Sequence, residues 1–317
     1  STIYLITFSF GVFHIEDTEA PMIQIIDRTN MARKDAKAAI VRELFSCVFY
    51  SDVERLRLRK EKELENKMRD ALKNGDFLVH LQPMIELKSG RTVCAEALVR
   101  WMDQDYGFIP PGDFIPLFER NGFIIPLDLY VFEQACKLLK KWMDKGIEPV
   151  TVAVNLSRVH LHDPSFIYEY DAIRQRYGVP AGLLEIELTE SMVFENPQVL
   201  IRIIDKLHEL GFLCSLDDFG SGYSSLNILK DIDVDTLKLD GAFWRSVRGD
   251  GQKERSIIET VVHLGKKLQM KTVSEGIERQ EQIDFLRQVE CDLVQGYYYS
   301  RPLPVEEFER YVFEGPQ

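Results

Sequence analysis

The sequence predicts an α/β protein, a modified TIM-type (β/α)8 barrel with one antiparallel strand, preceded by a small N-terminal α+β segment. Three observations lead to this prediction. Strand-like apolar runs alternate with helical stretches from Phe77 onward, eight such runs fit within about 240 residues, and only a short turn separates the first two. Strands that alternate with helices form parallel βαβ units, and eight of them are enough to close a barrel.

The first 62 residues are expected to lie outside the barrel. An apolar strand at 4–13, a helix from Met22 and a short strand at 47–50 make up the α+β segment, which spans residues 1–50. Residues 51–62 begin a helix in which positive and negative side chains are interleaved. Such interleaving is typical of a solvated helix, so this stretch is interpreted as a linker helix, and the barrel is assigned to residues 63–317.

The barrel strands are predicted from runs rich in β-branched and aromatic residues. These runs are 77–83, 92–100, 151–156, 183–188, 212–216, 236–239, 271–273 and 293–299. The last run ends in three tyrosines, which are expected to belong to the strand core. Helices are predicted at 127–145, 198–210 and 254–268. Ser89 and Gly90 form a hairpin signal between the first two runs, and this predicts the antiparallel strand.

Composition excludes several classes of protein. The chain has 39 Lys and Arg against 51 Asp and Glu, and its net charge of −12 argues against a DNA or RNA polymer as partner. The five cysteines are odd in number and include no CxxC pair, which argues against a disulfide framework or a zinc site and favours a cytoplasmic location. The apolar stretch 3–15 is too short to span a bilayer, so membrane attachment is expected only through segments outside this sequence.

Polar side chains recur where the predicted strands end. Because the carboxyl ends of parallel barrel strands share one face, these residues should meet at the barrel mouth. They are Glu96 with Arg100, Asn155, Glu187, Asp217 and Asp218, Lys238, Glu275, and Gln295.

The set of carboxylates predicts a metal site. Each carboxylate taken alone has a structural explanation: Asp217 could cap a turn, and Glu187 could pair with an arginine. Arg100 could likewise belong to a structural ion pair. Five carboxylates at one mouth would repel one another, and Lys238 alone leaves four negative charges, which two divalent cations would neutralise. Oxygen ligands favour Mg²⁺ or Mn²⁺, and a two-metal centre of this kind hydrolyses phosphoesters. Lys238 is then placed to orient or help deprotonate the attacking water.

The segment 217–226 is interpreted as a polar, glycine-rich loop at the mouth that orders when metal or substrate binds. Glu190, three residues after Glu187, could anchor this loop, or it could simply begin the next helix.

The ordered motifs resemble those of the EAL-domain family, over about residues 63–311. The motifs are Gln82-Pro83, Glu96-Ala97-Leu98-Val99-Arg100, Asn155-Leu156-Ser157, Glu187-Leu188-Thr189-Glu190, Asp217-Asp218-Phe219-Gly220, Lys238-Leu239-Asp240, Glu275-Gly276-Ile277-Glu278 and Gln295-Gly296-Tyr297. The resemblance implies metal-dependent hydrolysis of cyclic di-GMP to linear pGpG, with Mg²⁺ or Mn²⁺ as cofactor, Ca²⁺ as inhibitor and a homodimer formed through this domain.

The resemblance also implies roles for individual residues. One metal ion would be held by Glu96, Asn155, Glu187 and Asp217, and the second by Asp217, Asp218 and Glu275. Lys238 and Glu275 would be the catalytic residues, with Lys238 contacting the hydrolytic water. Substrate would be bound by Gln82, Leu98, Arg100, Asp240 and Gln295, while Glu190 and Glu278 would support the loop.

The front segment resembles the last strand and helix of a GGDEF domain, on the stretches 8–12, 26–28 and 32–37. The cyclase motif itself is absent from this sequence, so no cyclase activity is expected from this chain.

Two alternative functions stay open. The chain could be a receptor that binds cyclic di-GMP without hydrolysing it, or an unrelated barrel enzyme that uses hard metals on another phosphoester or on an enolisable acid. An intact set of carboxylates favours the hydrolase, because a pure binding module has no chemical need for them.

Overall fold

The computed structural model describes residues 8–15, 19–38, 45–220, 229–245 and 252–314. The chain divides into two compact units, Ser1–Arg69 and Asp70–Gln317, which are described separately. Within the described residues no helix is both long and apolar enough to cross a membrane. All five cysteines are free thiols, and Cys47 is the exposed one.

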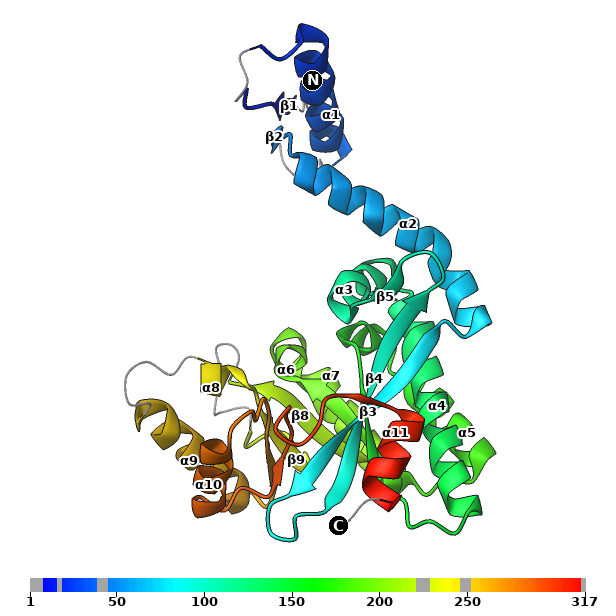
Figure 1. The fold of residues 1–317 in the computed structure, drawn as a ribbon, viewed down its shortest axis with the longest axis vertical. Coiled ribbons are helices and arrows are strands. Elements are labelled where there is room, and N and C mark those ends of the chain that lie inside the picture. Colours follow the sequence, from blue (N-terminus) through cyan, green and yellow to red (C-terminus); the bar gives the residue numbers. More distant parts are fainter. Residues whose placement is uncertain (1–7, 16–18, 39–44, 221–228, 246–251, 315–317) are drawn as a thin grey trace, which may run out of the picture. The chain divides into compact units, whose positions relative to one another are not determined.

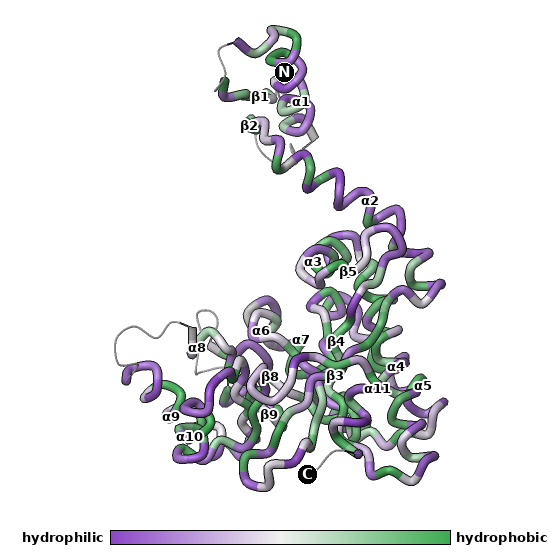
Figure 2. Tube along the Cα trace, in the orientation of Figure 1, coloured by the Kyte–Doolittle hydropathy of each residue, from purple (hydrophilic) through white to green (hydrophobic). Residues whose placement is uncertain are grey.

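The first unit contains two parallel strands and their crossover helix. Strand β1 (Phe8–Val12) pairs with β2 (Phe45–Phe49), and α1 (Met22–Ala38) connects them. Gly11 allows the strands to approach α1 closely, because a Cβ atom there would lie 2.3 Å from backbone atoms of Thr29 and Arg33. Helix α2 (Asp52–Asn74) then crosses the unit boundary, and Figure 2 shows that most of its residues are hydrophilic.

The second unit is a closed barrel of eight strands, so the predicted fold is confirmed (Figure 1). In chain order the barrel strands are β3 (Phe77–Glu86), β4 (Thr92–Asp103), β6 (Thr151–Asn155), β7 (Leu184–Thr189), β8 (Leu213–Phe219), β9 (Thr236–Leu239), β10 (Lys271–Ser274) and β11 (Leu293–Val294). Strand β3 is antiparallel to both of its barrel neighbours, β4 and β11, whereas the other neighbouring pairs are parallel.

Helices follow the parallel strands, as the alternating pattern predicts. They are α3 (Pro111–Asn121), α4 (Ile124–Asp144), α5 (Phe166–Tyr177), α6 (Glu190–Glu195), α7 (Pro197–Glu209), α8 (Ala242–Arg245), α9 (Gln252–Lys267), α10 (Gln280–Gln288) and α11 (Val305–Glu309). Two short strands, β5 (Gly107–Ile109) and β12 (Leu303–Pro304), extend the sheet at β4 and β3 and were not predicted.

The last predicted strand is too long. Strand β11 stops at Val294, and the amide of Tyr299 donates to the carbonyl of Gly296 (3.1 Å), which closes a turn. Tyr297 and Tyr298 are exposed, so the expectation that the three tyrosines form strand core is wrong.

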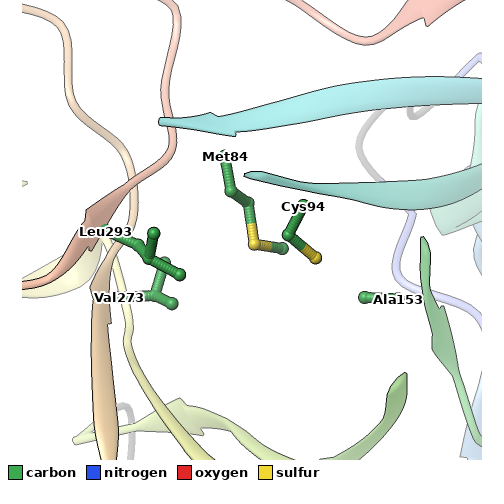
Figure 3. Close-up of a cluster of buried hydrophobic side chains, with 5 residues drawn as sticks. All are labelled: Met84, Cys94, Ala153, Val273 and Leu293. Carbon is green, nitrogen blue, oxygen red and sulfur yellow. The ribbon is translucent and has the colours of Figure 1, made fainter. Parts of the chain in front are cut away.

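A buried layer of side chains fills the middle of the barrel, with one residue from each strand. Five of its members are apolar and point into a common space (Figure 3): Met84, Cys94, Ala153, Val273 and Leu293. The other three, Glu185, Ser215 and Thr236, are polar. None of the eight is more than 7% exposed. Because side chains alternate along a strand, the residue two positions nearer the mouth also points inward, and this positions the site.

Candidate active site

The mouth of the barrel carries a ring of eight polar side chains. Each strand contributes the residue two positions beyond the middle layer, in the direction of the mouth. The ring consists of Gln82, Glu96, Asn155, Glu187, Asp217, Lys238, Glu275 and Gln295. All eight were predicted as site residues from the sequence, and the barrel brings them together.

Lys238 lies at the centre of this ring and is 1% exposed. Its Nζ atom is 2.7 Å from Glu187 Oε1, 2.9 Å from Glu275 Oε1 and 3.1 Å from Asp217 Oδ1. Glu96 Oε2 is farther away, at 3.7 Å. Burial alone would lower the pKa of Lys238, but the four carboxylates outweigh it and raise that pKa well above its ordinary value. The side chain is therefore a buried ammonium ion.

Glu96 is fixed by the side-chain amides of Asn155, on the neighbouring strand β6, and of Gln295, which directly follows β11. Asn155 Nδ2 donates to Glu96 Oε1 (2.8 Å), and Gln295 Nε2 donates to Glu96 Oε2 (2.7 Å). Gln295 Nε2 also donates to Gln82 Oε1 (3.0 Å), and Gln82 Nε2 donates to the carbonyl of Ser300 (3.2 Å). Burial would raise the pKa of Glu96, but Lys238 and these amide donors lower it overall. Glu96 is thus an oriented carboxylate.

A break in strand pairing lets Asp217 and Asp218 face the same site. Adjacent residues of a regular strand point to opposite faces. Here the β8–β9 register shifts between Leu216 and Phe219, and Asp218 adopts a left-handed backbone conformation (φ 58°), which aspartate tolerates. As a result, carboxylate oxygens of Asp217, Asp218 and Glu275 all lie within 4.8 Å of one another. This is the spacing of oxygen atoms around a bound cation.

Burial and mutual repulsion raise the pKa values of two acids of the ring and of the adjacent Asp218. Burial, followed by repulsion from Glu96, raises the pKa of Glu187 well above its ordinary value. Burial also raises the pKa of Glu275 to about 8, and burial with repulsion from Asp217 raises the pKa of Asp218 to about 7. Without a further cation, the ring therefore retains protons near neutral pH.

The donor set fits hard divalent cations. Glu187 Oε2 is buried and has no hydrogen-bond donor among the described residues. The surrounding ligand atoms are carboxylate and amide oxygens, and no cysteine or histidine belongs to the ring. Mg²⁺ and Mn²⁺ prefer such oxygen ligands. The acidic cluster of Asp217, Asp218 and Glu275 is thus suited to metal binding by both its chemistry and its charge.

Glu190 contacts the start of the glycine-rich loop. Its Oε2 atom accepts a hydrogen bond from the amide of Gly220 (3.0 Å). Gly220 has a φ of 94°, and a Cβ atom there would lie 2.0 Å from the ring of Phe243, so this position requires glycine. Residues 221–226 of the predicted loop lie outside the described part of the chain.

The remaining predicted residues fall in two places. Leu98, Asp240 and Glu278 line a cavity of about 770 Å³ at the mouth, together with Gln82, Glu96, Glu275 and Gln295. Glu278 therefore lies on the cavity wall beside the predicted substrate residues. Arg100 is not among the lining residues, and its Nη1 atom donates to the carbonyl of Val99 (2.8 Å).

Sequence reasoning missed residues that come from helices. Trp244, Arg255 and Arg279 line the same cavity, from α8, α9 and the residue preceding α10. None lies at the end of a strand, so the strand-end pattern could not identify them. Asp128 of α4 was also missed. Its Oδ2 atom accepts from the amide of Ser157 (3.1 Å) and is 3.0 Å from His160 Nε2, which fixes the segment after Asn155.

Curated relatives match most of this chain but extend well beyond it. The cyclic di-GMP phosphodiesterase NbdA of Pseudomonas aeruginosa is 37% identical over 264 residues, which cover 83% of this chain and 34% of that protein. The uncharacterized protein Mb1392c of Mycobacterium bovis is 34% identical, over 82% of this chain and 86% of that protein. The chain spans about a third of the length of the first three relatives, 31%, 34% and 31%.

A solved structure has the same fold. The PaMucR phosphodiesterase in its c-di-GMP complex superposes with a TM-score of 0.73 and 32% identity, covering 78% of this chain and 99% of that one. The model of the EAL domain family matches residues 65–302, which contain all eight residues of the mouth ring. The fold, the ring and these matches agree: the chain belongs to the EAL domain family.

Proposed function

We propose that this chain hydrolyses cyclic di-GMP to linear pGpG with two divalent cations, Mg²⁺ or Mn²⁺. The observation that carries the proposal is the convergence of Asp217, Asp218 and Glu275 within 4.8 Å, beside the buried ammonium of Lys238. The names of the relatives support the choice of substrate, since NbdA and PdeR of Escherichia coli are both named cyclic di-GMP phosphodiesterases.

The mouth ring and Asp218 would supply two groups of ligands. Glu96, Asn155, Glu187 and Asp217 would hold one ion, while Asp217, Asp218 and Glu275 would hold the other. Bound ions of this kind supply a Lewis acid for the phosphoryl oxygens and a nucleophilic water. Asp217 would belong to both groups. Its support is that the carboxylate lies between Lys238, at 3.1 Å, and the oxygens of Asp218 and Glu275, within 4.8 Å.

Lys238 would act on the attacking water and on developing charge. Its ammonium is held among the carboxylates at 2.7–3.7 Å, so it can donate a hydrogen bond to the water oxygen and offset negative charge on the phosphoryl group. In the balanced reaction, the water oxygen forms a bond to phosphorus and the bond from phosphorus to a ribose 3′ oxygen breaks. The water proton ends on that leaving oxygen, which gives pGpG.

The wall of the cavity would bind the dinucleotide. Leu98, Asp240 and Gln295 offer an apolar contact, an acceptor and an amide around the 770 Å³ cavity. The proposed phosphate contact of Arg100 requires its side chain to leave the carbonyl of Val99 when substrate binds. Glu190 and Glu278 would support the glycine-rich loop that begins at Asp217.

The test is a product assay. The chain is incubated with cyclic di-GMP in Mg²⁺, Mn²⁺, Ca²⁺ or EDTA, and products are separated by ion-pair chromatography. We expect pGpG with Mg²⁺ or Mn²⁺ and none with Ca²⁺ or EDTA. Binding of cyclic di-GMP without pGpG in any metal would establish the receptor alternative, and turnover only of other phosphodiesters in a substrate panel would establish an unrelated hydrolase.

We further propose that residues 1–50 are the end of a GGDEF-like domain, that 51–62 are a linker helix and that 63–317 form the catalytic barrel, which dimerises. The parallel pairing of β1 and β2 around α1 is consistent with a fragment of a larger α/β sheet. Sedimentation of residues 63–317 tests the barrel's independence and its dimerisation together, since a monomer at every concentration would contradict the dimer.

A further inference from the structure

The cavity at the mouth is larger than the acidic cluster requires. Glu96 and Glu275 line one part of it, and Trp244, Arg255 and Arg279 line another. In Figure 1, α9 and α10 lie side by side, and the cavity is lined by residues near the N-terminal ends of both helices. A ligand that fills the cavity must therefore contact this helical wall as well as the carboxylates.

Trp244 is held in the wall from two directions. Its indole Nε1 donates to Oγ of the fully buried Ser274 (3.0 Å), the residue directly before Glu275. Its ring packs edge-on against Phe285 of α10 (centroids 6.2 Å apart, 83° between planes). The preceding residue, Phe243, packs against Gly220 on the opposite side of β9. The indole is thus a fixed aromatic surface, and a fixed ring loses little entropy when a ligand stacks on it.

The helical wall also carries the cavity's guanidinium groups. Among the described residues that line the cavity, Arg255 and Arg279 are the only ones with a positive charge, against six carboxylates. The Arg255 guanidinium lies 5.6 Å from the centre of the Phe285 ring, and this is the same ring that Trp244 contacts. Arg255 and Trp244 therefore pack on the same ring and line the same cavity. A planar ring beside a forked donor matches a guanine, whose O6 and N7 atoms accept from arginine.

We propose that Trp244 and Arg255 form the subsite for the second guanine nucleotide, the one remote from the scissile phosphate, with Arg279 as an additional cation. Trp244 stacks on the purine, and Arg255 donates to O6 and N7. Ser274 is a positioning residue that fixes the indole. The inference rests on the proposed function and deepens it, because the subsite makes the enzyme select a cyclic dinucleotide over smaller phosphodiesters and guanine over adenine.

The experiment compares substrates that do and do not reach the wall. KM and kcat are measured for cyclic di-GMP, cyclic di-AMP and bis(p-nitrophenyl) phosphate with the parent chain, Trp244→Ala, Trp244→Phe and Arg255→Gln. We expect Trp244→Ala to raise KM for cyclic di-GMP about ten- to a hundredfold, and at least ten times more than KM for bis(p-nitrophenyl) phosphate. Trp244→Phe should recover most of that loss, and Arg255→Gln should reduce the preference for guanine over adenine by about tenfold or more.

A matched control is Tyr168→Ala, which removes an exposed aromatic ring of α5 that does not line the cavity. It should keep the parent KM. Equal losses on the dinucleotide and on bis(p-nitrophenyl) phosphate would assign Trp244 a merely structural role and overturn the subsite, as would parent values of KM and base preference in the variants.

Failure of the proposed function gives a different result. If the parent chain binds cyclic di-GMP but forms no pGpG with Mg²⁺ or Mn²⁺, hydrolysis is refuted. The same variants then test the subsite through the dissociation constant of cyclic di-GMP, measured by calorimetry in Ca²⁺. A tenfold or larger loss of affinity in Trp244→Ala would support the subsite, and no loss would reject it. A parent chain that neither binds nor cleaves cyclic di-GMP refutes both proposals.

Discussion

Replacing Lys238 by methionine tests the electrostatic design of the site. The substitution keeps most of the side-chain volume and removes a buried ammonium that lies 2.7–3.7 Å from four carboxylates. Removing one partner of a buried ionic network leaves uncompensated charge, which costs about 3–5 kcal/mol. We therefore expect the free energy of unfolding of the metal-free protein to fall by about 3 kcal/mol or more. Turnover should fall about 10²- to 10³-fold, the usual loss when one donor to a transition-state oxyanion is removed.

The assay measures unfolding in urea with EDTA and with saturating Mn²⁺, together with the rate of pGpG formation. Mn²⁺ should restore much of the lost stability, because divalent charge replaces the missing ammonium. Lys140→Met is the matched control. Lys140 forms an exposed i,i+4 pair with Asp144, so its loss should cost less than about 1 kcal/mol and leave turnover unchanged. If Lys238→Met unfolds within 1 kcal/mol of the parent in EDTA, or turns over at the parent rate, the assigned role of Lys238 is refuted.

Three other perturbations give distinct outcomes. Glu96→Ala should abolish pGpG formation and weaken Mn²⁺ binding in a calorimetric titration, and turnover at the parent rate would exclude Glu96 as a ligand. The pKa values of Asp218 and Glu275 are raised to about 7 and about 8, so a metal ion must displace protons when it binds. The apparent Mn²⁺ affinity should therefore rise as pH increases from about 6 to about 8.5, and calorimetry in buffers of different ionisation enthalpy should detect the released protons. An affinity that does not change with pH would contradict this. Gly220→Ala should destabilise the fold by about 1–3 kcal/mol, because the new Cβ atom would lie 2.0 Å from the Phe243 ring. The control Gly182→Ala has open space around the new Cβ atom and should change stability little. Equal melting temperatures for the two variants would contradict the packing argument.

The barrel could be predicted because its strands are short and separated by clear signals. The 236–239 run is buried and coincides with β9, and the Ser89-Gly90 turn identified the antiparallel hairpin. The prediction of the last strand was wrong because residues with high β propensity lie in a turn there. Three consecutive tyrosines favour a strand. In the structure the chain instead turns at Gly296, where a Cβ atom would lie 2.2 Å from the backbone of Ile277 and where the carbonyl accepts from the amide of Tyr299. Strands β5 and β12 are two or three residues long, too short for any periodic pattern.

The site could be predicted where function depends on strand ends. The carboxyl ends of parallel strands lie at the same end of a barrel, so Asn155, Glu187 and Lys238 could be predicted from the sequence to lie close together. The pattern carries no information about side chains from helices, so Trp244 and Arg255 were missed. Nor does it carry information about side-chain direction near the rim, so it did not anticipate that Arg100 bonds to the carbonyl of Val99.

The buried middle layer has a consequence for the order of events. Met84, Ala153, Val273 and the five other residues of the middle layer are buried beneath the ring. Among the described residues this layer closes the barrel interior, so in the proposed reaction the ions and the nucleotide would both enter from the mouth. A nucleotide seated at the mouth would bar the route for ions travelling in either direction. The proposed mechanism would then require the ions to bind before the nucleotide, and ions could exchange only after the product leaves.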